Sequence, residues 1–157
     1  MVDMPEPVMR RVVPPDTNKA LSTVSLKGEP HVIVCGSLMV TAPNMIAVAE
    51  AFMYRTAENL CHNHMAEILI WKGREAYSLK VKACERVESG PVFDKMSRSL
   101  EKMHMTLDGV WIFEVLEIWD EGIGNMTGSR VVRWTSRAGS AYPNGSSGPA
   151  SPFPSSG

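Results

Sequence analysis

The sequence predicts a mainly β protein of the α+β class, a small β-barrel of six strands with at least two short helices. Three observations support this prediction. The chain of 157 residues is 44% hydrophobic, which is enough for one compact core. Six segments rich in β-branched and other apolar residues are bounded by turns containing glycine, proline or asparagine. Two further stretches carry apolar residues at helical spacing instead.

The expected strands follow one another with short connections. The first two form a hairpin, in which the turn Lys27-Gly-Glu-Pro30 joins residues 20–26 to a β-branched run. That run begins at His31 and continues toward Val40. Alternation is clearest in the fifth strand, where the odd-numbered positions are apolar and the even-numbered ones polar. The remaining strands are expected at residues 45–50, 66–72, 77–83 and 110–120.

Two helices interrupt the strands. Residues 91–104 follow Ser89-Gly-Pro91, where proline suits a first helical turn, and we expect their methionine-rich face in the core. A shorter helix at residues 57–62 follows Thr56, whose hydroxyl is expected to cap the free amides at its start.

Both ends of the chain are expected to lie outside the folded domain, which we place at residues 18–122. Residues 1–17 contain four prolines and predict an extended N-terminal arm. Residues 123–157 predict a tail rich in glycine, serine and proline. Either this tail has no role, or it folds over a bound ligand or a partner subunit through its basic and aromatic residues, Arg130, Arg133, Trp134, Arg137 and Tyr142.

The charge balance narrows the function classes. Sixteen basic and 17 acidic side chains give a net charge of -1, so nucleic acid and anionic membranes are not expected partners. No stretch is long and apolar enough to span a membrane, and the N-terminus lacks the features of a signal peptide. We therefore expect a cytoplasmic protein with three free thiols, Cys35, Cys61 and Cys84.

The most informative segment joins the third strand to the short helix. There Arg55 supplies a planar guanidinium and Thr56 a hydroxyl, beside the unpaired amides of a helix start. This combination suits a phosphate, although a capped helix with a solvated arginine has the same pattern. The nearby Cys61, His62 and His64 lack a second cluster to complete a tetrahedral site, so no metal is predicted.

Five segments carry a resemblance to a known family: GSLMV at 36–40, RTAENL at 55–60, AEILIW at 66–71, YSLK at 77–80 and SGPVF at 89–93. In this order and spacing they resemble the FMN-binding split-barrel family related to pyridoxamine phosphate oxidase. The resemblance covers residues 21–120 and implies a six-stranded split barrel that dimerises and holds non-covalent FMN at the subunit interface. We also expect a homodimer because residues 110–119 carry much apolar surface.

The resemblance also implies the roles of individual residues. Arg55 and Thr56 match the pair that binds the FMN phosphate. One matching strand runs beside the ribityl chain and the flavin ring, and a neighbouring strand meets the polar edge of the ring through its backbone. The first strand contributes Val34, Cys35, Gly36 and Ser37, the second contributes Val48, Ala49 and Glu50, and Tyr54 and Lys80 are further candidates.

These matches imply an oxidoreductase that transfers hydride or electrons through FMN, with no side chain identified as catalytic and no donor or acceptor specified. Vitamin B6 oxidation is not expected, because no histidine follows His104 to form the basic substrate motif of true pyridoxamine phosphate oxidases. Two alternatives stay open. The ligand could be the deazaflavin F420, with its longer tail held by Arg10, Arg11 or Lys80, or the protein could carry flavin without turnover.

Overall fold

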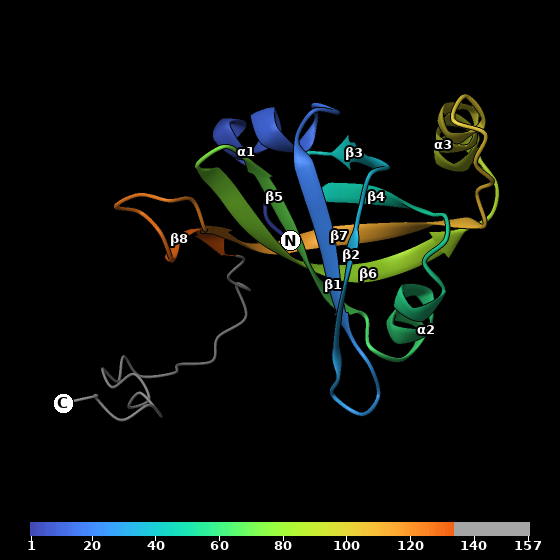
Figure 1. The fold of residues 1–157 in the computed structure, drawn as a ribbon, viewed down its shortest axis with the longest axis horizontal. Coiled ribbons are helices and arrows are strands. Elements are labelled where there is room, and N and C mark those ends of the chain that lie inside the picture. Colours follow the sequence, from blue (N-terminus) through green and yellow to red (C-terminus); the bar gives the residue numbers. More distant parts are fainter. Residues whose placement is uncertain (134–157) are drawn as a thin grey trace.

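The computed structural model describes residues 1–133, so the predictions for Trp134, Arg137 and Tyr142 lie outside the described residues. The fold is an antiparallel sheet of eight strands in the order β2-β1-β5-β6-β7-β4-β3, with β8 paired to β7 (Figure 1). The strands are β1 (Asn18–Val24), β2 (Pro30–Val34), β3 (Leu38–Ala42), β4 (Met45–Glu50), β5 (Met65–Lys72), β6 (Glu75–Val87), β7 (Gly109–Asp120) and β8 (Ser129–Arg133). The helices are α1 (Glu6–Val12), α2 (Tyr54–His62) and α3 (Pro91–Glu101).

The mainly β class and the six predicted strand regions are confirmed, but residues 1–133 form eight strands where six were expected. One extra strand arises because the run from His31 toward Val40 breaks at residues 35–37. There the Cys35 amide donates to the Lys19 carbonyl (2.9 Å), whereas the Ser37 carbonyl accepts from the Ala49 amide (3.0 Å). The chain thus leaves the edge beside β1 and joins the edge beside β4, which divides the run into β2 and β3.

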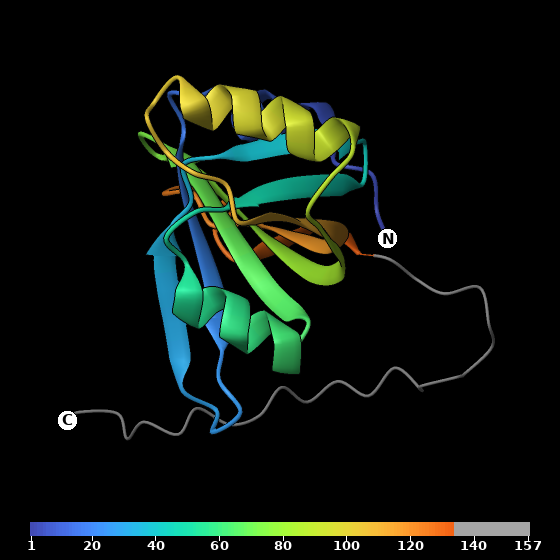
Figure 2. The ribbon, with the colours of Figure 1, turned by 90° about the vertical axis from the view of Figure 1, so that its right-hand side faces the viewer.

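The sheet is curled, as Figures 1 and 2 show, and its strands supply most of the main core. Its largest fully buried side chains include Leu21, Ile46, Ile68, Leu79 and Phe113, from five different strands. A second cluster lies where α3 covers β4 and β7, and there Met96 and Leu100 pack with Ala47, Ala49 and Val110. The predicted core role of the α3 methionine face is therefore confirmed for Met96, whereas Met103, beyond the helix end, is half exposed.

The N-terminal segment is not the extended arm that its prolines predicted. Pro5 precedes the seven-residue helix α1, a position where the fixed φ of proline favours a helix start. Val8 and Val12 are fully buried in the main core. The Val2 amide donates to the Val115 carbonyl (2.7 Å), and the Met4 amide donates to Pro43 (2.8 Å). Residues 1–12 are thus a packed part of the fold.

Two other element boundaries also differ from expectation. The helix α2 begins at Tyr54, three residues before its predicted start, so Thr56 lies inside its first turn and its hydroxyl makes no capping hydrogen bond. The sheet extends beyond residue 122, because Ser129–Arg133 forms β8 against β7 within the segment that was predicted as tail. Within residues 1–133, no helix is both long and apolar enough to cross a membrane.

Candidate functional site

Two pockets lie on either side of the start of α2. The strand pocket, of about 220 Å³, lies between the β2–β3 connection, β4 and the segment after α3. The hairpin pocket, of about 420 Å³, lies between the turn of the β1–β2 hairpin and α2. Strand β2 contributes His31 to the hairpin pocket and Ile33 and Val34 to the strand pocket, so one ligand lying along β2 would contact both. The strand pocket is lined by Ile33, Val34, Cys35, Gly36, Ser37, Val48, Ala49, Ala51, Met53, Met103 and Met105.

Six of the predicted flavin-contacting residues meet in the strand pocket: Val34, Cys35, Gly36, Ser37, Val48 and Ala49. They come from β2, from the connection between β2 and β3 at residues 35–37, and from β4. The space beside Gly36 is open, because a Cβ there would have no atom within 4 Å. Among the described residues, the amides of Gly36 and Ser37 take part in no backbone hydrogen bond and are free to donate to a ligand.

The chemistry of the strand pocket is apolar and rich in sulfur. Cys35 is buried, and burial raises the pKa of its thiol to about 12, so the thiol stays protonated at neutral pH. Met53, Met103 and Met105 add flexible thioethers that can adapt to a planar ring. Met103 and Met105 were not predicted, because they follow α3 and nothing in the local sequence connects them with β2.

The side chain of Glu50, a residue whose backbone was expected to meet the flavin ring, makes its contacts within the protein. Its carboxylate accepts hydrogen bonds from Arg86 Nε (2.7 Å), Arg86 Nη2 (3.0 Å) and Trp111 Nε1 (2.6 Å), and its carbonyl accepts from the Asp108 amide (2.9 Å). Glu50 does not line the strand pocket. The side chain ties β4 to β6 and β7, and its carboxylate is fully engaged within the protein.

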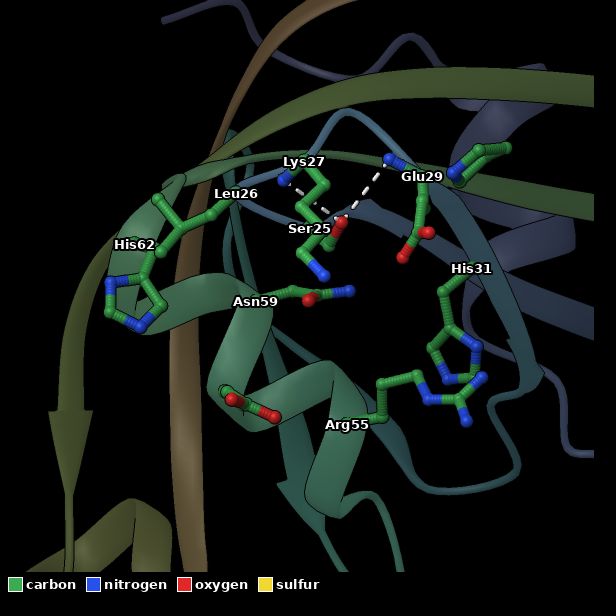
Figure 3. Close-up of a pocket in the computed structure, with 10 residues that line it drawn as sticks. Ser25, Leu26, Lys27, Glu29, His31, Arg55, Asn59 and His62 are labelled. Atoms are coloured by element: carbon green, nitrogen blue, oxygen red, sulfur yellow. Dashed lines mark hydrogen bonds between the residues drawn. The ribbon is translucent and has the colours of Figure 1, made fainter.

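The hairpin pocket is held in shape by hydrogen bonds on both of its walls (Figure 3). Ser25 Oγ accepts from the amides of Lys27 and Glu29 (both 3.2 Å), which fixes the hairpin turn. Buried Asn59 donates through Nδ2 to Thr23 Oγ1 (3.0 Å) and so fastens α2 to β1. Arg55 lies one turn before Asn59 on the same helix face, as the spacing i, i+4 requires. The pocket is therefore preformed in the folded chain.

Ionisable side chains line the hairpin pocket from both walls. The hairpin contributes Lys27, Glu29 and His31, and α2 contributes Arg55, Glu58 and His62. In Figure 3 the side chains of Arg55 and His31 extend toward the same side of the pocket. Within the part of the chain that the structure describes, Arg55 forms no salt bridge. The histidines and Lys27 were not predicted to line a pocket, although the turn that carries Lys27 and His31 was predicted to form a hairpin.

The other predicted cofactor residues do not join Arg55. Thr56 is fully buried and lines neither pocket, and its Oγ1 has no hydrogen-bond partner among the described residues. Tyr54 is exposed at the start of α2. Lys80 lies on the outer face of β6, where its ammonium group pairs with Glu117 (3.1 Å). The Thr56 hydroxyl is therefore unpaired but does not open into a pocket, and Lys80 lines neither the strand pocket nor the hairpin pocket.

Arg10 and Arg11, which were considered as ligands of the longer F420 tail, lie away from Arg55. Arg10 pairs with Glu6 (3.6 Å), and Arg11 Nε donates to Glu75 Oε2 (2.6 Å). Both belong to α1, which packs against β3 and β5, whereas α2 packs against β1 and β2. Figure 1 shows the two helices at different ends of the sheet. Arg55 and these arginines thus do not form one site.

Cys61, His62 and His64 are all exposed, and only His62 lines one of the two pockets. Among residues 1–133, no group of three or more histidine, cysteine, aspartate and glutamate side chains is arranged to hold a metal ion.

No known family model and no curated protein matches this sequence. Solved structures do match. An FMN-binding protein from Syntrophomonas wolfei subsp. wolfei is 18% identical, with 68% of this chain and 78% of that chain covered, at a TM-score of 0.62. HupZ from Group A Streptococcus is 19% identical, with 80% and 100% covered, at a TM-score of 0.68. A proposed pyridoxamine 5'-phosphate oxidase from Lactobacillus delbrueckii is 18% identical, with 74% and 93% covered, at 0.62.

The chain has the pyridoxamine 5'-phosphate oxidase-like split-barrel fold. The resemblance inferred from five short segments is thereby confirmed at the level of the fold. Other similar structures are an F420 reductase, the heme storage protein HutZ from Vibrio cholerae and a heme-binding protein from Mycobacterium smegmatis. The split-barrel fold is therefore shared by proteins with several different ligands, and the fold alone does not identify the ligand of this chain.

Proposed function

We propose that the protein binds FMN non-covalently, with the flavin ring in the strand pocket and the phosphate beside Arg55, and that it acts as an oxidoreductase. The observation that carries this proposal is the meeting of six predicted ring-contacting residues in one pocket, from Val34 on β2 to Ala49 on β4. Strand β2 leads from there to the preformed pocket of Arg55. The FMN-binding protein among the similar structures supports the same ligand.

The residues present suit a flavin. Bound FMN would supply the redox chemistry, accepting one or two electrons. Gly36 leaves room for close approach of a planar ring, and the amides of Gly36 and Ser37 can donate to its polar edge. Methionine side chains shield the ring from water. Cys35 stays a neutral thiol and therefore packs against the ligand without attacking it.

The phosphate contact can be tested with a matched pair of variants. Replacing Arg55 by Ala should weaken FMN binding by roughly 1.5 to 3 kcal/mol, the scale of a hydrogen bond to a charged group, and should leave riboflavin binding unchanged. Arg98→Ala, which removes an exposed arginine of α3, is the control and should bind FMN as the wild type does. Quenching of flavin fluorescence gives both affinities. An unchanged FMN affinity for Arg55→Ala would overturn the phosphate assignment.

We propose that the active species is a homodimer, although β7 does not supply the exposed apolar surface that its sequence suggested. Most apolar side chains of β7 are buried by their own chain. The exposed apolar surface lies beside the strand pocket, where Val34 is 85% exposed, Val32 64%, Phe52 70% and Tyr54 77%. Strand β2 also lies at the edge of the sheet, and no strand within residues 1–133 pairs with its outer side. A second copy that covers this surface would enclose a flavin in the strand pocket.

Light scattering in the presence of FMN tests this arrangement. We expect a dimer of the 17.3 kDa chain at micromolar concentration. Val34→Lys places a charge in the proposed interface and should yield monomers, whereas Val13→Lys, at an exposed position after α1, should not. A wild-type monomer with FMN bound would contradict the shared site.

Two further measurements separate the alternatives that stay open. The visible spectrum of the purified protein distinguishes FMN from F420, because the two ligands absorb differently. Steady-state reduction by NADH or NADPH then distinguishes an oxidoreductase from a flavin carrier. Reduction without turnover of any acceptor would favour the carrier.

A further inference from the structure

The charges that line the hairpin pocket cancel unless its histidines are protonated. Lys27 and Arg55 contribute two positive charges, and Glu29 and Glu58 contribute two negative ones. The net charge of these four groups is therefore zero. Only His31 and His62 remain, and histidine is the side chain whose charge ordinarily changes between pH 5 and 8. The two imidazoles decide whether the pocket as a whole attracts an anion.

Of the two histidines, His31 is the better placed to act together with Arg55. It is half-buried on β2, the strand that leads to the strand pocket, and its side chain extends toward the same side of the pocket as Arg55 (Figure 3). His62 lies two turns along α2 from Arg55 and is exposed at the other side of the pocket. A ligand that extends from the strand pocket into the hairpin pocket along β2 would reach His31 and Arg55 before His62.

We propose that His31 is a second phosphate-binding residue, which in its imidazolium form donates to the same phosphate monoester that Arg55 binds. This inference rests on the proposed function and deepens it. The carboxylates of Glu29 and Glu58 offset the charges of Arg55 and Lys27 in this pocket, so a positive charge on His31 strengthens phosphate binding. The site therefore selects FMN over riboflavin most strongly at mildly acidic pH.

The test compares His31→Gln with the wild type at pH 6 and pH 8, using FMN and riboflavin. Glutamine keeps a hydrogen-bonding side chain of similar size but cannot become charged. The ratio of the two FMN dissociation constants, variant over wild type, should be about ten or more at pH 6 and should be smaller at pH 8. Both proteins bind the same FMN at each pH, so the comparison accounts for the ionisation of the phosphate itself, whose second pKa is near 6. For riboflavin the ratio should be about one at both pH values.

Two other histidine variants complete the experiment. His62→Gln should give a smaller ratio with the same dependence on pH. His64→Gln is the matched control, because His64 lines neither pocket, and its ratio should be one throughout. If His31→Gln does not fold, inorganic phosphate added to the wild-type protein at pH 6 should shift the NMR signals of the His31 imidazole and not those of His64.

The outcomes separate this inference from the proposed function. If the wild type prefers FMN over riboflavin but His31→Gln gives a ratio of one at pH 6, or the same ratio at both pH values, His31 is not a charged phosphate ligand. The inference is equally overturned if His64→Gln behaves as His31→Gln does, or if phosphate leaves the His31 signals unchanged. If the wild type binds FMN and riboflavin equally, the phosphate site at Arg55 itself fails, and with it the proposed function.

Discussion

Replacing Glu50 by Gln should destabilise the fold strongly while leaving flavin affinity almost unchanged. The carboxylate of Glu50 is nearly buried and accepts three hydrogen bonds, two from Arg86 and one from Trp111. Arg86 lies on β6 and Trp111 on β7, so one side chain at the end of β4 joins three strands. The amide of Gln can accept only at its oxygen, and its NH₂ group would face donors.

The size of the loss follows from these contacts. Removing one partner of a buried ion pair costs about 3–5 kcal/mol, because the other charge is left without compensation. Arg86 is only partly buried and keeps a hydrogen bond to the Asp108 carbonyl (3.2 Å) and a contact with Glu88. We therefore expect Glu50→Gln to lower the free energy of unfolding by about 2–4 kcal/mol at pH 7.

Urea denaturation followed by circular dichroism measures this change, and Glu88→Gln is the control. Glu88 pairs with the same arginine but is exposed, so its loss should cost less than about 1 kcal/mol. A loss below about 0.5 kcal/mol for Glu50→Gln would refute the view that its carboxylate is structural. A tenfold weaker FMN affinity without loss of stability would show that the side chain contacts the ligand after all.

Three further predictions follow from other parts of the structure. In the native protein at pH 8, a thiol reagent should modify exposed Cys61 and Cys84 quickly, and Cys35 only after denaturation, because burial raises the pKa of the Cys35 thiol to about 12; rapid modification of three thiols would contradict this. Burial alone would raise the pKa of Glu117, but hydrogen bonds and charges from its basic and indole neighbours lower the pKa overall. The ionised Glu117 carboxylate therefore stabilises the fold at neutral pH, and this contribution is lost as the pH falls through the lowered pKa. Glu117→Gln should accordingly be less stable than the wild type at pH 7 and equally stable near about pH 2 in urea titrations; an equal difference at both pH values would argue against an ionic role. Removal of residues 124–157 should lower the thermal midpoint by several degrees, because it takes β8 away from β7, and an unchanged midpoint would show that β8 adds nothing to the sheet.

Much of the sheet could be predicted because its strands have strong local signals. Residues 45–50 were placed without error, since the turn before them and the apolar run are contiguous in the sequence. The same reasoning could not detect the break at residues 35–37. That break depends on hydrogen bonds to Lys19 and Ala49, which are distant in the chain. Local propensity favours one continuous strand there, and tertiary pairing overrides it.

The candidate site shows the same division between local and distant information. Arg55 could be predicted, because the helix start and the basic residue are adjacent. The burial of Thr56 could not be predicted, because it depends on where α2 begins. The helix starts three residues earlier than expected, so Thr56 lies on its buried face and not at its N-terminal end. Met105 joins the strand pocket through long-range packing, for which the sequence carries no local signal.

The docking of the N-terminal segment also constrains the order in which the chain can fold. Val2 and Met4 hydrogen-bond to Val115 and Pro43, and Val8 packs into a core that includes residues of β7. During synthesis these first residues emerge long before β7 exists. At about 5–20 residues per second, the delay is roughly 6 to 20 seconds. We expect α1 to dock last, as the step that closes the core, and bulky fusions at the N-terminus to slow this step more than fusions at the other end.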